Sequence, residues 1–443
     1  MKRWILSALF VLGLAANVWA QNPAPQSVAI GAGAGNGNAT DLRQQTFDIV
    51  WQTVKDKHFD PTLGGVDWEK VRQQYQPKVT EAKSDEELYR LLQQMLGELH
   101  QSHFNIIPPE AVIADDVAEP PTGGIGIDLR MIDGAAIVVR VEPGSMAEAS
   151  GLHTGFVIKQ IGNKTVDALI APLAKSTQAD AIRKLQMARR VMREINGEPG
   201  TSVAIVYEDS KAKTNLAVVT RAKMKGELSP KLGNFPPQYT EFESKRLPGN
   251  IGYIRFNIFT TPISGKVRLA LAELRDADGL IFDLRGNPGG VAGIATGIAG
   301  QLSEKSGVLG TMKMRTSELK FAVFPQQNAY TGPVAILIDG MSASTSEVFS
   351  SGMQGLGRAV VIGETSAGAC LPSYFQKLPT GALFQFAIAD FKTSKGVLIE
   401  GRGVIPDVEV KWNRASLLNG RDAQLETAIE RLTQARQRER SVK

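Results

Sequence analysis

Residues 333–347 read Pro333-Val-Ala-Ile-Leu-Ile-Asp-Gly-Met-Ser-Ala-Ser-Thr-Ser-Glu347, an apolar run followed by small and hydroxyl-bearing residues. The apolar run predicts a buried strand over 333–338, and a helix is predicted over 346–355. Ser344 therefore lies between a strand and a helix, where the free N–H groups of the first helical turn favour negative charge. That position suits a nucleophile, although hydroxyl residues at a helix start often serve only as caps.

The same alternation of apolar strands and helices continues on both sides of this run. Further strands are predicted over 251–256, 279–284 and 359–362, helices over 265–275, 293–302 and 422–438, and a hairpin-like stretch over 383–400. Continuous apolar strands separated by helices indicate a parallel or mixed sheet that is covered on both faces. The predicted fold class of this half of the chain is α/β.

A glycine-rich turn follows the strand predicted over 279–284. It reads Asp283-Leu-Arg-Gly-Asn-Pro-Gly-Gly290. A tight turn that needs positive φ angles would explain the glycines by itself. The turn ends the predicted strand that precedes the strand leading into the serine run.

The middle of the chain carries a different set of motifs. Residues 123–129 read Gly-Gly-Ile-Gly-Ile-Asp-Leu, and a strand over 136–141, the turn 142–147 and an amphipathic helix over 180–195 follow. In this order they resemble a PDZ domain. The resemblance implies that the turn Gly124-Ile125-Gly126-Ile127 binds a peptide's terminal carboxylate and that the strand after it pairs with the peptide. The alternative is a small β-domain that only packs against the rest of the protein.

The serine run and the glycine turn together resemble the C-terminal processing and tricorn-like serine peptidases. The tail Gly401-Arg-Gly-Val-Ile-Pro-Asp407 resembles a terminal signature of the same family, and the likeness spans residues 41 to 412. It implies an α/β, crotonase-like (ClpP-like) core with a PDZ domain and a helical N-terminal domain. It also implies an oxyanion hole built from the N–H of Thr345 and that of Gly289 or Gly290, and neither a metal nor a cofactor.

The catalytic base is the open question that this resemblance raises. The processing branch of the family uses a lysine, but the corresponding segment here reads Ser366-Ala-Gly-Ala369. Lys377, Lys392 and Lys395 follow, in hairpin-like segments where lysine normally faces water. A chain without any base would lose most of its peptidase activity.

The chain has four histidines, and two of them, His100 and His103, lie in a segment similar to one of the tricorn-like branch. Segment 96–103, Leu-Gly-Glu-Leu-His-Gln-Ser-His, resembles the segment from which that branch takes its histidine, so Ser102 and His103 are the candidates. We interpret His58, His100 and His153 as structural or exposed. A histidine base needs a third group to orient it, and by the resemblance Glu400 occupies that position.

The N-terminal end of the sequence predicts export. Lys2 and Arg3 precede the apolar run 4–16, and small residues around Ala20 suit cleavage of a signal peptide after that residue. An uncleaved membrane anchor, which would keep the protein close to a membrane, is the alternative. The predicted organisation is a signal peptide (1–20), a flexible linker (21–40), a helical N-terminal domain (41–118), a PDZ domain (119–226), a peptidase core (245–415) and a C-terminal helix (416–443).

Composition restricts the classes of protein further. Of 443 residues 43% are hydrophobic and 21% charged, as in a globular protein with more than one domain. The formal net charge of +5 is mild and no basic block is present, so nucleic acid is not an expected partner. Cys370 is the single cysteine, so no intramolecular disulfide can form.

The sequence therefore predicts an exported serine endopeptidase that acts on proteins or peptides. In the expected mechanism His103, oriented by Glu400, activates Ser344. The alternative is an inactive pseudo-peptidase that binds peptides or apolar ligands. The oligomeric state and the physiological substrate are not predicted.

Overall fold

The computed structural model describes residues 36–109, 123–174, 180–233, 235 and 237–442. Residues Leu42–Lys443 cluster as one unit by their contacts, and Met1–Asp41 as another. The predicted signal peptide and the linker up to residue 35 lie outside the described residues, and so does the proline-rich break at Pro120 and Pro121. No helix in the described ranges combines the length and the apolar character that a membrane span requires.

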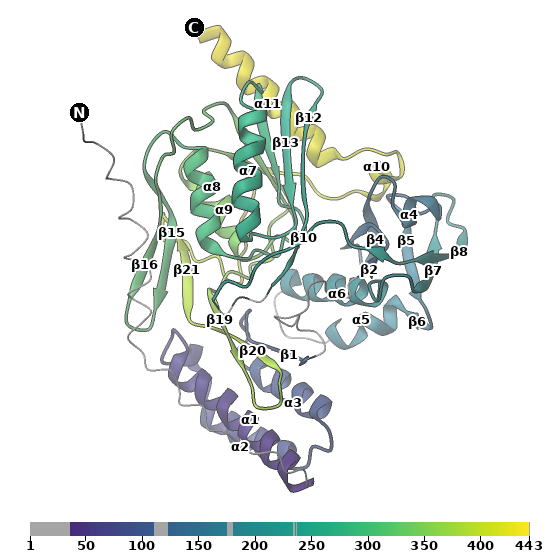
Figure 1. The fold of residues 1–443 in the computed structure, drawn as a ribbon, viewed down its shortest axis with the longest axis vertical. Coiled ribbons are helices and arrows are strands. Elements are labelled where there is room, and N and C mark those ends of the chain that lie inside the picture. The colour runs from purple at the N-terminus through teal and green to yellow at the C-terminus, as the bar shows by residue number, and fades with distance from the viewer. Residues whose placement is uncertain (1–35, 110–122, 175–179, 234, 236, 443) are drawn as a thin grey trace, which may run out of the picture. The chain divides into compact units, whose positions relative to one another are not determined.

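The N-terminal helical region comprises α1 (Asn36–Lys57), the 3-10 helix η1 (Leu63–Gly65), α2 (Trp68–Thr80), α3 (Asp85–Gly97) and strand β1 (Asn105–Ile107) (Figure 1). Helix α3 begins at Asp85, where the Ser84 side chain caps it by accepting a hydrogen bond from the Glu87 N–H. Helix α2 buries Trp68, Val71 and Tyr75 at helical spacing.

This helical region shares its hydrophobic core with a segment almost 300 residues later in the chain. Strand β1 pairs antiparallel with β20 (Leu383–Ala387), and β20 pairs with β19 (Ser373–Lys377). Phe384 and Phe386 of β20 are buried in one cluster with Leu88 of α3. The chain that follows His103 is therefore held against the C-terminal half by strand pairing and by apolar packing.

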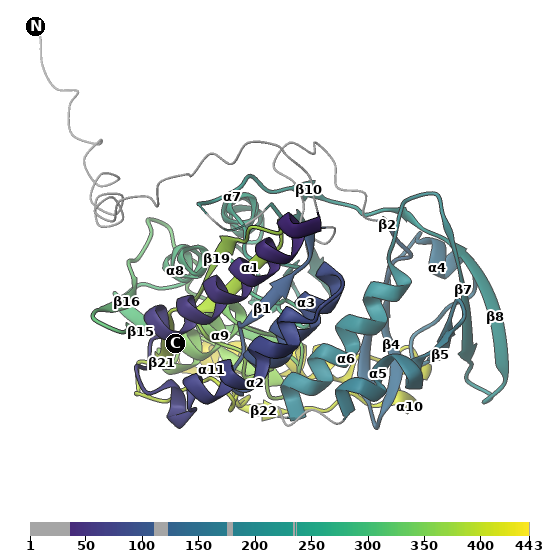
Figure 2. The same ribbon diagram turned by 90° about the horizontal axis from the view of Figure 1, so that it is seen from below.

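Residues 123–223 form what we call the β-rich region. Its elements are β2 (Gly123–Gly124), β3 (Ile127–Ile132), β4 (Ala135–Val141), α4 (Met146–Ala149), β5 (Val157–Ile161), β6 (Lys164–Thr165), α5 (Val166–Ala174), α6 (Asp180–Ile195), β7 (Ser202–Glu208), β8 (Thr214–Thr220) and β9 (Ala222–Lys223). The main sheet has the order β3-β4-β5-β7-β8, so β3 and β8 are its edges. Helices α5 and α6 cover one side of this sheet (Figure 2).

The C-terminal α/β region is built on a six-stranded sheet. Its order is β12 (Phe242–Leu247), β13 (Ile251–Phe256), β14 (Gly279–Asp283), β17 (Val334–Ile338), β18 (Val360–Gly363) and β22 (Val408–Glu409). All neighbours are parallel except β12 and β13. The other elements are β10 (Glu227–Leu228), β11 (Tyr239–Thr240), α7 (Thr261–Glu273), α8 (Ala292–Gln301), β15 (Gly307–Met314), β16 (Glu318–Val323), α9 (Thr345–Gly355), β21 (Ala389–Thr393), α10 (Arg414–Leu418) and α11 (Ala423–Val442).

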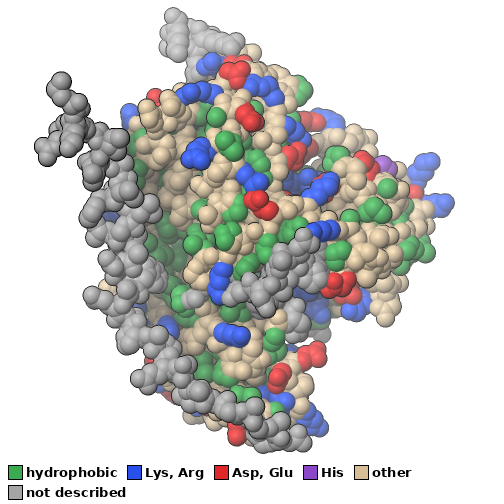
Figure 3. All heavy atoms as spheres, viewed as in Figure 1, with side chains coloured by type: hydrophobic (Ala, Val, Ile, Leu, Met, Phe, Trp, Pro, Cys, Tyr) green, Lys and Arg blue, Asp and Glu red, His purple; other side chains and the backbone are tan. Residues whose placement is uncertain are grey.

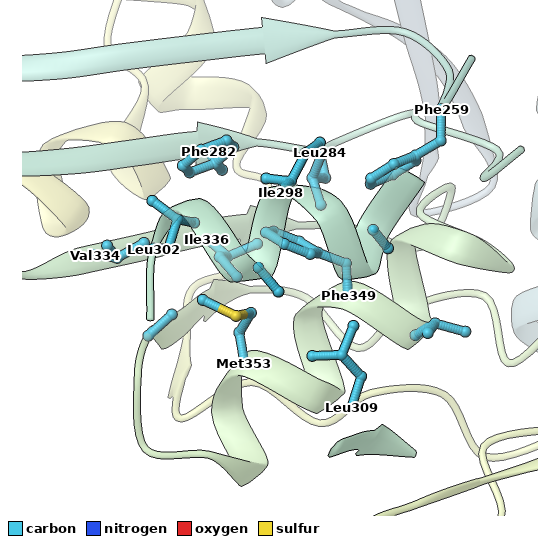
Figure 4. Close-up of a cluster of buried hydrophobic side chains, with 14 of the residues drawn as sticks. Phe259, Phe282, Leu284, Ile298, Leu302, Leu309, Val334, Ile336, Phe349 and Met353 are labelled. Carbon is cyan, nitrogen blue, oxygen red and sulfur yellow. The ribbon is translucent and has the colours of Figure 1, made fainter. Parts of the chain in front are cut away.

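Helices cover both faces of this sheet, as the continuous apolar strands predicted. Phe282 and Ile336 point to one face, where Phe349 of α9 and Ile298 of α8 meet them (Figure 4). Residues one position away along the same strands point to the opposite face and pack against α11. Over the face shown in Figure 3, positive and negative side chains are interspersed.

Most element boundaries of this region agree with the sequence predictions, but the start of α7, the end of α11 at Val442 and the pairing of residues 383–400 differ from them. Helix α7 begins at Thr261 and not at residue 265, because Pro262 occupies the first turn, where a missing N–H is harmless. The predicted hairpin does not extend over the whole of 383–400, since the chain turns back antiparallel only at Lys392 and Leu398. Strand β20 pairs with β19 and β1, whereas β21 pairs with β15, so the two halves of that stretch belong to different sheets.

Candidate active site

Two turns meet at the carboxyl edge of the central sheet. Strand β14 leads into the glycine turn, residues 284–290, and its parallel neighbour β17 leads into the nucleophile turn, residues 339–344. The Ala343 N–H donates to the Asn287 carbonyl oxygen at 3.1 Å, which joins the turns directly. The carboxyl edge of a parallel sheet is a common place for an active site, because successive loops converge there.

Ser344 is the residue immediately before α9. Its φ is +55°, which is uncommon for a residue other than glycine and is typical of strained functional turns. Its backbone N–H donates to the Ala369 carbonyl oxygen and to the Glu347 carboxylate, at 2.8 Å in both cases. The surrounding structure therefore holds the half-buried Ser344 at the start of the helix in a conformation that the residue would not adopt by itself.

Glu347 is a residue of the site to which the sequence analysis gave no role. Its fully buried carboxylate accepts hydrogen bonds from the Ser344 N–H, the Ser366 hydroxyl, and the Gly368 and Ala369 N–H groups. Burial raises the pKa of Glu347 to about 7, and these donors act in the opposite direction. A glutamate three residues after a serine at a helix start is a capping-box pattern, and that signal could have identified it.

The structure brings Ser102, His103 and Glu400 together from opposite ends of the chain. The Ser102 hydroxyl lies 2.7 Å from His103 Nδ1 and donates to Glu400 Oε2 at 2.9 Å. The Ser102 N–H donates to the other carboxylate oxygen of Glu400 at 2.8 Å. Glu400 was expected to orient His103. In the structure it reaches the histidine through the Ser102 hydroxyl.

The environment of His103 favours a neutral imidazole. Burial of the ring, together with the positive charge of Arg189 on α6, lowers the pKa of His103 to about 4. Its φ of +60° is a second case of unfavourable backbone geometry in this site. Burial raises the pKa of Glu400, and the hydrogen bonds from Ser102 and from the Cys370 N–H oppose that rise.

The relay of Glu400, Ser102 and His103 lies close to the nucleophile turn. Cys370, whose N–H binds Glu400, directly follows Ala369, whose carbonyl oxygen accepts the Ser344 N–H. The hydrogen bonds of the described residues do not include one between the Ser344 hydroxyl and the His103 ring. The contact that a general base makes with its nucleophile often tightens only when substrate is bound.

The other candidate bases lie elsewhere. His58 has its ring hydrogen-bonded to the Asp60 carbonyl oxygen and to Gln101, and it stacks on Phe104, which is a structural role. The side chains of Lys377, Lys392 and Lys395 are exposed.

The backbone of the glycine turn lies close to Ser344. A Cβ added at Gly289 would lie 2.6 Å from the Ser344 Cβ and 2.7 Å from the Thr345 nitrogen. The Gly289 N–H already donates to the Asn287 side chain, at 2.9 Å. The Gly290 N–H donates to none of the described acceptors, and the Thr345 hydroxyl binds the Gly290 carbonyl oxygen at 2.6 Å. Gly290 is therefore the better placed of the two candidate oxyanion donors.

Comparison with known proteins places two parts of the chain in known families. Residues 250–410 match peptidase family S41, and residues 40–97 match the tricorn protease C1 domain. The carboxyl-terminal-processing protease of Picosynechococcus sp. is 24% identical over 395 residues, which cover 87% of this chain and 88% of that protein. Tricorn protease homolog 2 of Streptomyces coelicolor is 23% identical over 407 residues, which cover 87% of this chain and 32% of that protein.

A solved structure of the photosystem II D1 C-terminal processing protease has the same fold. Its TM-score is 0.59 at 20% sequence identity, over 88% of this chain and 97% of that chain. The chain belongs to the C-terminal processing and tricorn-like serine peptidases of family S41, and it is a serine-type peptidase. The family expected from the sequence is confirmed, whereas the assignment to a branch without the catalytic lysine stays a prediction.

Replacement of Gly289 by alanine tests whether the glycine turn must approach the nucleophile this closely. The added Cβ would collide with Ser344, and Gly289 has a φ of +103° that alanine disfavours. We expect Gly289→Ala to slow reaction of Ser344 with a fluorophosphonate by on the order of 100-fold, because a displaced glycine turn also moves the adjacent Gly290 N–H away from the reacting oxygen. Gly293→Ala is the matched control, because a Cβ there meets nothing within 4 Å. Equal reaction rates for the two variants would contradict the prediction.

Proposed function

We propose that this chain is an exported serine endopeptidase that hydrolyses peptide bonds of extracytoplasmic proteins by acyl transfer. Ser344 is the nucleophile, His103 is the general base, and Glu400 orients His103 through Ser102. The observation that carries the proposal is the Ser102 hydroxyl, which lies between the His103 ring and the Glu400 carboxylate.

The proton count in this relay defines which nitrogen acts as the base. The Ser102 hydroxyl has one hydrogen, which it donates in its hydrogen bond to Glu400. In its contact with His103 the hydroxyl oxygen must therefore be the acceptor, so Nδ1 of His103 carries the hydrogen and Nε2 has the lone pair. That nitrogen is the one available to take the proton of Ser344. Once His103 is charged, the negative charge of Glu400 stabilises it through the shared hydroxyl.

The reaction then follows the usual course of acyl transfer. Ser344 Oγ attacks the peptide carbonyl, and the N–H groups of Thr345 and Gly290 bind the oxygen as it becomes negative. Thr345 is the first residue of α9, so its N–H has no partner within the helix. His103 gives its proton to the leaving amine, and a water molecule, deprotonated by His103, releases the acyl group from Ser344.

The segment in which the processing branch has its lysine plays a different part in this proposal. Ala369 has no side chain that could act as a base, but both of its backbone groups are used. Its N–H binds Glu347 and its carbonyl oxygen binds the Ser344 N–H. This arrangement supports a tricorn-like site in which the base comes from the N-terminal helical region.

The β-rich region is, in this proposal, a PDZ domain that binds the C-terminus of the substrate. The N–H groups of Ile125 and Gly126 donate to none of the described acceptors and are available to a carboxylate. Strand β3, which follows this turn, is an edge strand to which a peptide can add. Leu185 of α6 packs on Ala343 and Ala369, so α6 adjoins the nucleophile turn.

The remaining parts of the proposal concern the core and the location. The six-stranded sheet and its helices form a crotonase-like (ClpP-like) core, which the parallel strand order supports. Residues 1–20 act as a signal peptide that is cleaved after Ala20, which the basic start and the apolar run support. An extracytoplasmic location then follows.

Covalent labelling tests the proposed nucleophile. The purified protein should react with a fluorophosphonate at Ser344, as located by mass spectrometry of the labelled peptide, because an activated serine attacks phosphorus as it attacks a carbonyl. Ser344→Ala should not react, and Ser342→Ala is not a suitable control because that hydroxyl holds the turn. A folded wild-type protein that stays unlabelled would favour the inactive peptide-binding alternative.

Removal of the Ser102 hydroxyl tests the relay. Ser102→Ala separates His103 from Glu400 while both side chains remain, so we expect kcat to fall about 100-fold, within the range for a positioned base. Glu400→Gln should have a similar effect, and the double variant should lose little more, because the groups act as one unit. Lys392→Met is the control for a lysine base. If Lys392→Met abolished turnover while Ser102→Ala and Glu400→Gln did not, His103 would not be the base.

The pH dependence of kcat/KM tests the charge state of His103. Only neutral His103 can accept a proton, so activity should fall on acidification near pH 4, and not near the value of about 6.5 of an ordinary histidine. Arg189→Met removes a positive neighbour, which stabilises the imidazolium and should move the acid limb to higher pH. Arg190→Met, which changes the adjacent arginine, should leave the limb in place. An unmoved limb in Arg189→Met would contradict this account.

A further inference from the structure

Strand β3 carries two charged side chains on the face that is turned to the C-terminal α/β region. Asp128 binds Arg255 of β13 at 2.7 Å, and Arg130 binds Asp339 at 2.6 Å. Residues two apart in a strand point the same way, and Leu129 between them lies in the core of the β-rich region. Two ion pairs of opposite polarity thus fix this strand on the peptidase core.

The second of these ion pairs reaches the active site. The Asp339 side chain is fully buried and that of Arg130 is 9% exposed. One oxygen of Asp339 accepts the Arg130 Nε–H, and the other accepts the N–H groups of Gly286 and Met341, both at 3.0 Å. Gly286 belongs to the glycine turn and Met341 to the nucleophile turn. A single carboxylate therefore joins β3 to both turns that form the site.

The Arg130 guanidinium has little freedom to move. One of its terminal nitrogens donates to the Leu129 carbonyl oxygen at 2.8 Å. The other lies over Gly286, where an added Cβ would come within 2.7 Å of it. A shift of β3 would therefore displace Arg130 against the glycine turn, and Asp339 would move with it.

We propose that Arg130 is a positioning residue for the peptidase reaction. Through Asp339 it holds the glycine turn and the nucleophile turn in their reacting geometry. This inference rests on the serine-peptidase mechanism proposed above. Arg130 does not touch the reacting atoms.

The physical basis is the cost of leaving one member of a buried ion pair alone. Without Arg130, the Asp339 carboxylate keeps only its backbone donors, and its negative charge is buried where water cannot screen it. The turns must therefore rearrange. Displacements of about 1 Å at reacting groups cost on the order of 100-fold in rate. The loss should appear in kcat and in the rate of acylation more than in KM.

The test compares the labelling rate of Ser344 by a small fluorophosphonate in wild type, Arg130→Met, Arg130→Lys and Asp339→Asn. Arg130→Met and Asp339→Asn should label about 10- to 100-fold more slowly than the wild type. Arg130→Lys, which keeps the charge, should recover most of the rate.

Arg255→Met is the matched control, because it breaks the other ion pair of β3, which makes no contact with the two turns. It should leave the labelling rate unchanged in folded protein, as checked by chemical denaturation. The inference would be overturned if the wild type is labelled and folded Arg130→Met is labelled at the same rate. It would also be overturned if Arg255→Met lost as much labelling rate as Arg130→Met. If Arg130→Met does not fold, Asp339→Asn decides, since asparagine still accepts the two N–H groups. Absence of wild-type labelling would instead reject the proposed function itself.

Discussion

The buried carboxylate of Glu347 is the interaction on which the site depends. A carboxylate without solvent is costly unless several donors surround it, and here four donors and the start of α9 do so. Those donors belong to the nucleophile turn and to segment 366–369, so the two segments are held together at one point. Ser344 keeps its unfavourable φ because this network opposes relaxation.

The same network explains how a chain with alanine at position 369 can retain a serine-peptidase geometry. The backbone of Ala369 still fixes Ser344, but no side chain there can accept a proton. In the proposed mechanism His103 is the base, and β1, which pairs with β20, follows it closely in the chain. Because the helical region and β20 bury one common core, loss of packing in that core would also displace His103. The proposed mechanism therefore links activity to stability.

The sequence predicted local features well where one physical rule dominated. Apolar strands β13, β14 and β17 and the amphipathic helix α6 all follow from residue periodicity. It failed over 383–400, because two adjacent strands with similar patterns joined different sheets. Strand pairing between distant segments depends on the space that other elements leave, and no local pattern contains that information.

The sequence alone identified the candidate catalytic groups: a serine before a helix, a glycine turn after a buried strand, a Ser-His pair and an acidic residue near the end of the chain. Only the tertiary structure decided how they are connected. In the folded chain the Ser102 hydroxyl lies between His103 and Glu400, the Gly289 N–H donates to the Asn287 side chain, and Asp339 links Arg130 to both turns. These contacts join residues up to 298 positions apart. A hydrogen bond requires its donor and acceptor to lie within about 3 Å, and only the packing of the folded chain can bring such distant residues that close.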